Sequence, residues 1–246
     1  PNRDLSDYVA ERIRARVNDP QVAELLIPRD HGFGMRRMPM ETGYFEAYNR
    51  DKGRLVSLLD TPIERITKTG LQTSEESFDF DVLVYATGFD VMTGAFDKID
   101  IRGADGQKLK EKWQGSPTTY LGVMVNGFPN MLMVAGPQSV SGSTNYPRAI
   151  EVCVDWIGAL LEHARTAGLS RLEADVDAEN TWTQEVIDMQ EAMPFSKVKS
   201  WFTGFNANVQ AADAAPRYIA YWGGAPRYTK ILNRVASEGF RDINMD

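Results

Sequence analysis

The sequence has little of what several kinds of functional site require. It contains one cysteine, Cys153, and two histidines, His31 and His163. A disulfide or a cysteine-based metal site within the chain is therefore excluded, and neither histidine has a cysteine or carboxylate partner at metal-ligand spacing. We expect no metal site, no Ser/His/Asp hydrolase site and a reducing, cytoplasmic location.

Long apolar runs and blocks of basic residues are also missing. No stretch reaches the roughly 18 apolar residues that suggest a membrane crossing, and residues 1–20 carry no apolar segment of the kind that drives secretion. The chain has 27 basic and 34 acidic residues and a net charge of −7. We therefore expect neither a nucleic acid nor a membrane as partner. A hydrophobic content of 43% is sufficient for a globular core.

Apolar residues recur at three- and four-residue steps in several segments, which predicts amphipathic helices. The first covers residues 5–17 and ends before Asp19-Pro20. Further helices are predicted at residues 21–26, 148–166, 177–192 and 226–236, with Pro147 in the first turn of the longest. The tryptophans expected to pack in the core are Trp156, Trp182 and Trp222.

Extended runs alternate with these helices. Three short runs are separated by predicted turns, as the strands of β-hairpins usually are. These runs are residues 54–59, 62–67 and 70–73. Residues 82–86, Val-Leu-Val-Tyr-Ala, have no polar alternation, which predicts a strand buried on both faces of a parallel sheet. Two more strands are predicted at 120–125 and 130–136. The pattern predicts an α/β fold.

Three segments are candidate ligand sites. Ala-Thr-Gly-Phe-Asp at 86–90 follows the predicted buried strand, where α/β sheets bind ligands, although a turn that requires Gly88 is an equally good explanation. The loop at 136–147 leads into a helix whose free N–H groups suit an electron-rich ligand, although an ordinary capped helix explains it too. The arginine pair at 36–37 lies in a predicted loop, where arginines usually face solvent.

The neighbourhood of the arginine pair is specific. Arg36-Arg37, Tyr44-Phe45 and Tyr48-Asn49-Arg50-Asp51 closely resemble a motif of the class I Baeyer–Villiger monooxygenases, which include the phenylacetone and cyclohexanone types. The resemblance runs from about residue 4 to the end of the chain. It departs from the family in the loop after Asn206, where many relatives have Pro-Gly-Lys, and at Arg36, which is commonly lysine.

The resemblance implies part of a flavoprotein with two Rossmann-like dinucleotide-binding domains for FAD and NADPH. Residues 1–34 would end a helical insertion, 35–86 would be the returning part of the NADPH-binding domain, and 87–246 would be the carboxy-terminal part of the FAD-binding domain with its carboxy-terminal helices. The sequence has no Gly-x-Gly-x-x-Gly loop and no Phe-x-Gly-x-x-x-His-x-x-x-Trp-Pro fingerprint. An amino-terminal half of the same enzyme is therefore expected as a partner that supplies them.

The activity that the resemblance implies is insertion of one oxygen atom of O₂ next to a ketone carbonyl, which gives an ester or lactone. Arg37 would be the catalytic residue, because its permanent charge can stabilise an anionic flavin peroxide. Arg36 would contact the 2′-phosphate of NADPH and Trp201 the nicotinamide nucleotide, although Trp201 is equally well explained as a core aromatic. Arg37 itself is also an implied cofactor contact, as are Tyr146, Thr87 and Gly88. The implied substrate contacts are Ser141, Gly142 and Ser143.

Two other interpretations stay open. A related flavin monooxygenase that oxidises nitrogen or sulfur would share most of these motifs. Alternatively, the chain is a non-catalytic fragment that binds a partner and has no activity without an amino-terminal half.

Overall fold

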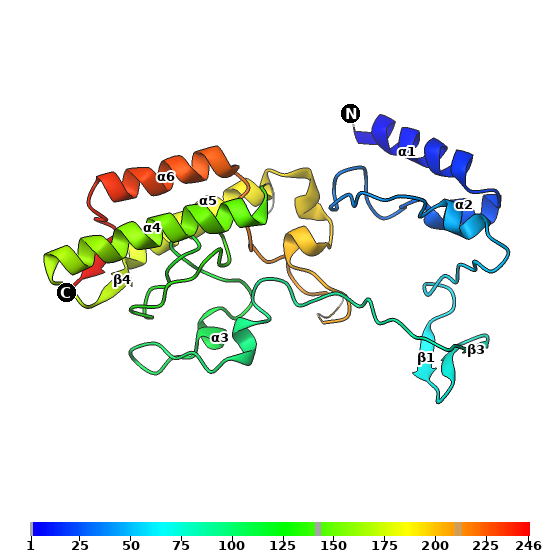
Figure 1. Cartoon of the computed structure of the whole chain (residues 1–246), viewed down its shortest axis with the longest axis horizontal. Coiled ribbons are helices and arrows are strands. Elements are labelled where there is room, and N and C mark those ends of the chain that lie inside the picture. Colours follow the sequence, from blue (N-terminus) through cyan, green and yellow to red (C-terminus); the bar gives the residue numbers. More distant parts are fainter. Residues whose placement is uncertain (1, 141–143, 210, 212) are drawn as a thin grey trace. The chain divides into compact units, whose positions relative to one another are not determined.

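The computed structural model describes residues 2–140, 144–209, 211 and 213–246, and it divides into two compact units, Pro1–Thr87 and Gly88–Asp246. The division lies one residue from the expected boundary between the NADPH and FAD parts, but the assignment of either part to a cofactor stays a prediction. Figure 1 shows the elements of both units. Besides the helices and strands given below, short helical turns are η1 Glu46–Asn49, η2 Phe96–Lys98, α3 Leu109–Lys112, η3 Pro194–Lys197 and η4 Trp201–Thr203.

Unit 1 begins with the two predicted helices, α1 (Asn2–Arg16) and α2 (Pro20–Leu26). Asp19 is the N-cap of α2, because its carboxylate accepts the Gln21 backbone N–H at 2.8 Å. The buried face of α1 packs on α2 through a small core of Ala10, Ile13, Val17, Ala23 and Ile27. The amphipathic helix predicted at residues 5–17 is thus confirmed.

A small antiparallel sheet follows, with strands β1 (Ile63–Ile66), β2 (Gly70–Thr73) and β3 (Ser77–Asp79) in that order. The predicted hairpin at 62–73 is confirmed. The strand predicted at 54–59 is wrong, because that segment ends in a turn with Leu59 almost fully exposed. β3 was not predicted, since three residues are too short for an alternating pattern.

The strand predicted at 82–86 is also wrong. The segment has no regular secondary structure, and Val82, Val84 and Tyr85 are exposed. A strand of a parallel sheet needs hydrogen-bonding neighbours, and within the described ranges both sheets are antiparallel and neither includes these residues. The segment therefore exposes apolar side chains instead of burying them in a sheet.

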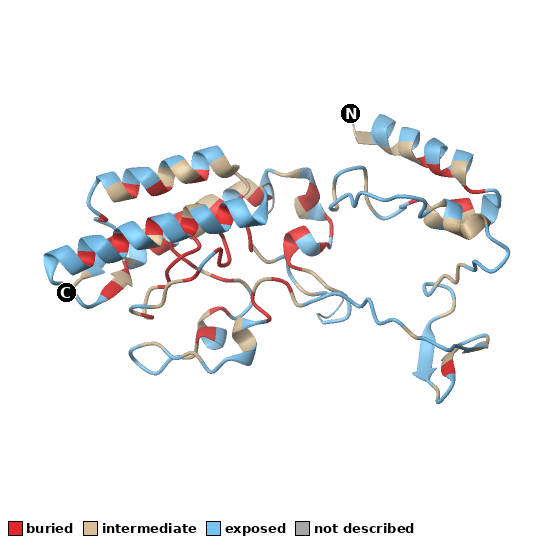
Figure 2. Cartoon of the chain, viewed as in Figure 1, coloured by how far each residue is buried: buried red, intermediate tan, exposed pale blue. Residues whose placement is uncertain are grey.

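Unit 2 is built on three helices, α4 (Tyr146–Ala167), α5 (Val176–Glu191) and α6 (Ala225–Ser237), all close to the predicted ranges. α4 and α6 are in contact and run side by side, and Figure 2 shows the buried stripe along α4. Asn145 caps the start of α4, and Gly168 ends it in the left-handed conformation with φ 72°.

The core of unit 2 lies between these helices. Trp156 and Trp182 are buried in it, as predicted, and Trp222 is partly buried beside Phe195 and Phe202. The thiol of Cys153 is fully buried, with its Sγ 3.7 Å from the Tyr228 hydroxyl oxygen.

The strands predicted at 120–125 and 130–136 are wrong, although both segments are largely buried. Leu121, Gly122, Asn130 and Ala135 have φ between 52° and 70°, a left-handed conformation that interrupts an extended strand. The strands that do form in unit 2 are β4 (Leu172–Ala174) and β5 (Ile243–Met245), an antiparallel pair that the sequence did not predict.

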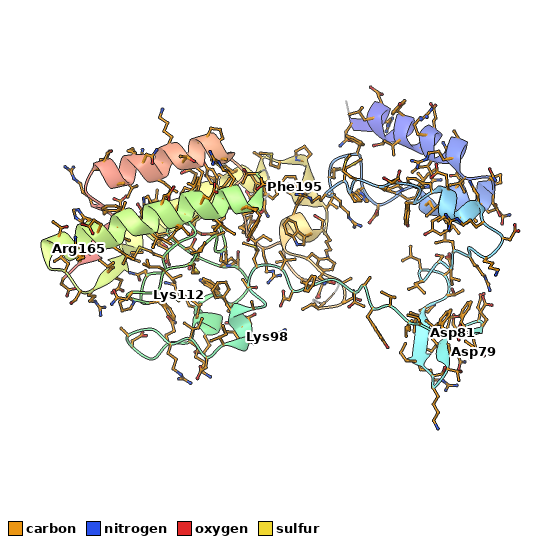
Figure 3. The ribbon with its side chains drawn as sticks, in the orientation of Figure 1. Asp79, Asp81, Lys98, Lys112, Arg165 and Phe195 are labelled. Carbon is orange, nitrogen blue, oxygen red and sulfur yellow. The ribbon has the colours of Figure 1, made fainter. Side chains whose placement is uncertain are left out.

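A buried ion pair connects two parts of unit 2. Lys112, which is labelled in Figure 3, contacts Glu179 of α5 with Nζ and Oε1 2.8 Å apart. The other oxygen of Glu179 accepts the Asn126 backbone N–H at 2.6 Å, and Lys112 donates to the Asn126 carbonyl at 2.8 Å. The Glu179 side chain is 3% exposed, so the pair replaces the hydration that the carboxylate has lost.

None of the helices in the described part of the chain combines the length and apolar character that a membrane crossing requires. Among the same residues, no three His, Cys, Asp or Glu side chains gather in a way that could hold a metal ion.

Candidate functional site

Unit 1 contains a cavity of about 670 Å³ bounded by α1, the end of α2 and the loop at residues 31–45. Its lining is mostly apolar and comes from side chains such as Ile13, Leu26 and Met38. Both residues of the arginine pair, Arg36 and Arg37, also line it. A mainly apolar hollow with a few charged groups is the usual form of a small-molecule site.

Arg36 is held at the cavity by an ion pair. Its Nη2 lies 2.7 Å from the Asp30 carboxylate, whose other oxygen is 2.7 Å from Nδ1 of His31. The hydrogen bond to His31, together with the nearby Arg36 charge, holds the pKa of Asp30 below its usual range. Asp30 therefore stays ionised and orients Arg36.

Arg37 has a different environment. Its side chain is exposed, and no ion pair or hydrogen bond joins it to another described residue. A guanidinium group stays protonated at any pH at which a protein is folded, so this charge is present and not neutralised by a nearby carboxylate of the described chain. The two arginines of the pair are thus structurally distinct.

Other residues of the arginine motif have structural contacts. Asn49 donates from Nδ2 to the Arg16 carbonyl at 2.7 Å, and its Oδ1 accepts the Asn18 N–H at 2.8 Å, so it fixes the chain where α1 ends. Tyr48 donates to the Tyr44 hydroxyl oxygen at 3.1 Å, and this hydrogen bond raises the pKa of Tyr48 to about 12. These contacts stabilise the fold, so the presence of Asn49, Tyr48 and Tyr44 in the motif has a structural explanation.

A second group of predicted residues meets in unit 2. Asn206 donates from Nδ2 to the Phe89 carbonyl at 2.9 Å, which joins the Gly88 segment to the chain just after η4. Trp201 is the first residue of η4 and is 42% exposed, whereas Phe202 beside it packs on Phe195, labelled in Figure 3, with ring centroids 5.0 Å apart. The core aromatic at this turn is therefore Phe202, and Trp201 faces solvent.

Arg217, which no sequence motif marks, connects these segments. It pairs with Asp90 at 3.1 Å, and it donates to the Thr93 hydroxyl at 2.7 Å and to the Gly204 carbonyl at 3.0 Å. Thr93 is 124 positions away in sequence, so no local pattern could have indicated the contact.

The loop before α4 forms the third group of residues, which also lies in unit 2. Tyr146 donates from its hydroxyl to the Ala135 carbonyl at 3.4 Å. Gln138 is fully buried at φ 66°, and its amide oxygen accepts the Thr119 N–H at 3.0 Å. The Ser139 hydroxyl is buried without a hydrogen-bond partner among the described atoms. The predicted substrate residues Ser141, Gly142 and Ser143 lie outside the described residues.

The predicted site residues thus fall into groups that each belong to one unit. Arg36, Arg37 and Thr87 belong to unit 1, and Gly88, Tyr146 and Trp201 belong to unit 2. Thr87 and Gly88 are exposed on either side of the division. Within unit 2 the Gly88 segment is tied to the turn that carries Trp201.

Similar sequences cover almost the whole chain. A 2-oxo-Δ³-4,5,5-trimethylcyclopentenylacetyl-CoA monooxygenase from Pseudomonas putida is 37% identical over 244 residues, 99% of this chain and 45% of the relative. Phenazine N-monooxygenase PhzNO1 from Lysobacter antibioticus is 37% identical over 97% of the chain and 43% of its own length. A Baeyer–Villiger monooxygenase from Pseudooceanicola batsensis is 32% identical over 100% of the chain and 44% of its own length. No protein-family model matches.

Solved structures agree in fold over the whole chain. The complex of OTEMO with FAD and NADP superposes with a TM-score of 0.92 at 37% identity, covering 100% of this chain and 44% of that one. Cyclohexanone monooxygenase from Rhodococcus sp. Phi1 bound to NADP⁺ also gives 0.92, at 33% identity and 45% coverage of its chain. The predicted α/β class is confirmed by these neighbours. The chain is thus similar over its whole length to Baeyer–Villiger monooxygenases and spans about 45% of the length of these relatives, a share consistent with their carboxy-terminal portion.

Proposed function

We propose that this chain is part of an NADPH- and FAD-dependent Baeyer–Villiger monooxygenase that converts a ketone and O₂ into an ester or lactone. The observation that carries the proposal is the position of Arg37 at the mainly apolar cavity of unit 1, with no carboxylate partner among the described residues. The cavity suits the hydrocarbon part of a ketone, and the guanidinium group suits its carbonyl oxygen.

Bound flavin, once reduced by NADPH, supplies the electrons that activate O₂. The task of Arg37 is to stabilise the negative charge that develops on oxygen during attack on the ketone, because a guanidinium stabilises an anion without giving up its proton. Two unit charges about 4 Å apart at an effective dielectric near 20 interact by roughly 4 kcal/mol. A stabilisation of that size corresponds to about a thousandfold in rate.

The described residues also fit the cofactors. Arg36 presents a guanidinium fork, already oriented by Asp30, that suits the 2′-phosphate of NADPH, and the exposed face of Trp201 suits its nicotinamide nucleotide. Thr87, Gly88 and Tyr146 are assigned to the flavin. The buried Ser139 hydroxyl without a partner lies in the same loop as Tyr146 and fits a polar ligand edge.

The rest of the enzyme has to supply what this sequence lacks. We assign residues 1–34 to a helical insertion, 35–86 to the NADPH-binding domain and 87–246 to the FAD-binding domain, with both pyrophosphate loops in an amino-terminal half. The apolar segment at 82–86 supports this partner, because contiguous apolar side chains that are exposed here are usually covered by another protein surface. A cytoplasmic location, where NADPH is available, follows from the same assignment. The described residues that would face the substrate are those of the Arg37 cavity, and Ser141, Gly142 and Ser143 are assigned to the same task.

The test is Arg37→Ala in the complete enzyme. We expect flavin to be reduced by NADPH at an unchanged rate, while ester formation falls about a thousandfold and the consumed O₂ is released as hydrogen peroxide. Arg37→Lys, which keeps the charge but loses the planar fork, should retain part of the ester. Arg65→Ala, at an exposed position of β1, is the matched control and should behave as the unsubstituted enzyme. Ester formation at the normal rate by Arg37→Ala would refute the assignment.

A nitrogen-oxidising activity is a second candidate, because phenazine N-monooxygenase is as similar to this chain as the trimethylcyclopentenylacetyl-CoA enzyme. A panel of ketones, aromatic nitrogen heterocycles and sulfides separates the candidates. An N-oxide formed faster than any ester would favour the alternative.

The third hypothesis to test is that the chain is a non-catalytic fragment. Its mass and its visible spectrum decide it, since a colourless 27.5 kDa monomer that also binds no FAD when mixed with the amino-terminal half would be a non-catalytic fragment.

A further inference from the structure

We infer that Arg217 is a positioning residue that holds the Trp201 turn against the Gly88–Asp90 segment and thereby sets the geometry of flavin reduction by NADPH. The inference rests on the proposed function for the roles of the two segments. It concerns a residue that lies outside the arginine motif at residues 36–51.

The guanidinium of Arg217 reaches three groups on two separate segments. Nη2 contacts the Asp90 carboxylate at 3.1 Å, Nη1 donates to the Thr93 hydroxyl at 2.7 Å, and Nε donates to the Gly204 carbonyl at 3.0 Å. Only a branched planar group can make these contacts at once, since a lysine ammonium is a single point of charge. The contacts therefore depend on arginine itself.

The site is shielded from water, which strengthens the contacts. The Arg217 side chain is 14% exposed, and Thr93 is buried. The backbone of Arg217 is fixed as well, because its N–H donates to the Thr203 carbonyl at 2.9 Å and its own carbonyl accepts from the Gln190 side chain at 3.1 Å. Arg217 is thus anchored to α5 and to η4 before its side chain reaches the Gly88–Asp90 segment.

Gly204 shows that the fit is close. Its φ is 67°, and a Cβ at this position would lie 2.9 Å from Nε of Arg217. The turn that follows Trp201 is therefore built around the Arg217 side chain. Asn206 adds a second link from the same turn, by donating to the Phe89 carbonyl.

A merely structural arginine would stabilise unit 2 and nothing more. Arg217 instead joins the turn of the exposed Trp201 to Asp90, two residues after the exposed Gly88. Trp201 and Gly88 are the residues assigned to the nicotinamide and flavin sides. Hydride transfer requires the two rings to approach in a fixed geometry, and misplacement by about 1 Å can cost on the order of a hundredfold in rate. The reduction step should therefore be sensitive to Arg217.

The experiment compares Arg217→Ala and Arg217→Lys in the complete holoenzyme by stopped-flow reduction of the flavin with NADPH and no ketone present. We expect the reduction rate constant divided by the NADPH dissociation constant to fall about tenfold or more for Arg217→Ala, with FAD still bound. Arg217→Lys should fall between that variant and the unsubstituted enzyme. Arg227→Ala, which removes an exposed pair with Glu185, is the matched control and should change nothing. A fall of less than threefold for Arg217→Ala overturns the inference.

Amide hydrogen exchange provides a readout that needs no activity. The Thr203 and Phe205 amides donate to the Ser200 carbonyl at 3.0 and 2.9 Å, and in Arg217→Ala both should exchange at least tenfold faster while the α6 amides are unaffected. Unchanged exchange at these amides would also overturn the inference, even if reduction were slower.

Failure of the proposed function gives a different result. An unsubstituted enzyme that is reduced by NADPH but makes no ester would refute the ketone assignment. The inference about Arg217 would still be tested by the reduction rates of its variants. A holoenzyme that NADPH does not reduce at all would overturn the inference as well.

Discussion

The two units of this chain differ in how much of their stability they can provide themselves. Unit 2 packs α4, α5 and α6 around one large apolar core, whereas the described part of unit 1 has a small core between α1 and α2 and a sheet whose first strand is exposed throughout. Burial of apolar surface is the main favourable contribution to folding. Unit 2 should therefore fold on its own, and unit 1 should depend on a covering surface.

The largest expected effect is on the core of unit 2. Trp156→Ala removes a side chain that is 4% exposed, its edge-on contact with Phe240 and its 3.0 Å hydrogen bond to the Leu232 carbonyl. We expect the free energy of unfolding to fall by about 3–5 kcal/mol. Denaturant unfolding followed by tryptophan fluorescence reports unit 2 alone, since all five tryptophans of the chain lie in it.

The matched control for this variant is Leu161→Ala on the same helix, at a position that is exposed. It should change the free energy of unfolding by about 1 kcal/mol or less. Equal effects of the two substitutions would contradict the view that α4 stabilises unit 2 through its buried face.

The second prediction concerns the buried charge pair. Lys112→Met leaves the Glu179 carboxylate without its cation, which should lower the stability of unit 2 by up to about 3 kcal/mol. Adding Glu179→Gln should recover much of the loss, because the buried charge is then gone. Lys110→Met, on the exposed side of α3, serves as control. A double variant no more stable than Lys112→Met would show that the lost stability came from packing.

The smallest expected effect is a pH dependence within unit 1. Hydrogen bonds from Arg16 lower the pKa of Glu41 and of Glu46. Since both folded-state pKa values lie below the unfolded ones, the stabilisation is complete above the usual glutamate range and is lost as the pH falls through the lowered values. The groups are solvent-screened, so the effect should be modest.

Hydrogen exchange of the α1 amides, corrected for the intrinsic pH dependence, measures this effect. Acidification should speed their exchange in the unsubstituted chain and much less in Arg16→Gln. The same acid response in both would show that the pairs of Arg16 with Glu41 and Glu46 do not stabilise unit 1.

The sequence predicted the helices of both units well, because caps and apolar periodicity are local. Asp19 before α2 and Asn145 before α4 are caps that can be recognised from a few residues. Local patterns could not show whether residues 82–86 form a strand. An apolar run looks the same in a strand that has hydrogen-bonding neighbours and in a segment that lacks them. The segments around Leu121 and Ala135 failed for another reason, since these two left-handed residues are of types that rarely adopt positive φ and that apolar patterns place in strands.

In the candidate site, too, local features could be predicted from the sequence and long-range contacts could not. The motif at residues 36–51 led to Arg37 and its cavity, but the structural contacts of Asn49 and Tyr48 were not evident from it. Arg217 was missed entirely, because its partners come from distant parts of the chain and no periodicity marks them. Long-range polar contacts are determined by the tertiary fold.

The sole thiol of the chain has a practical use that follows from its burial. Cys153 lies on the inner face of α4 with no solvent-accessible surface, so an alkylating reagent can reach it only after the helices around it separate. Its labelling rate therefore measures how often unit 2 opens, under native conditions and at one atom. Because no second cysteine competes for the reagent, a single mass shift records each opening.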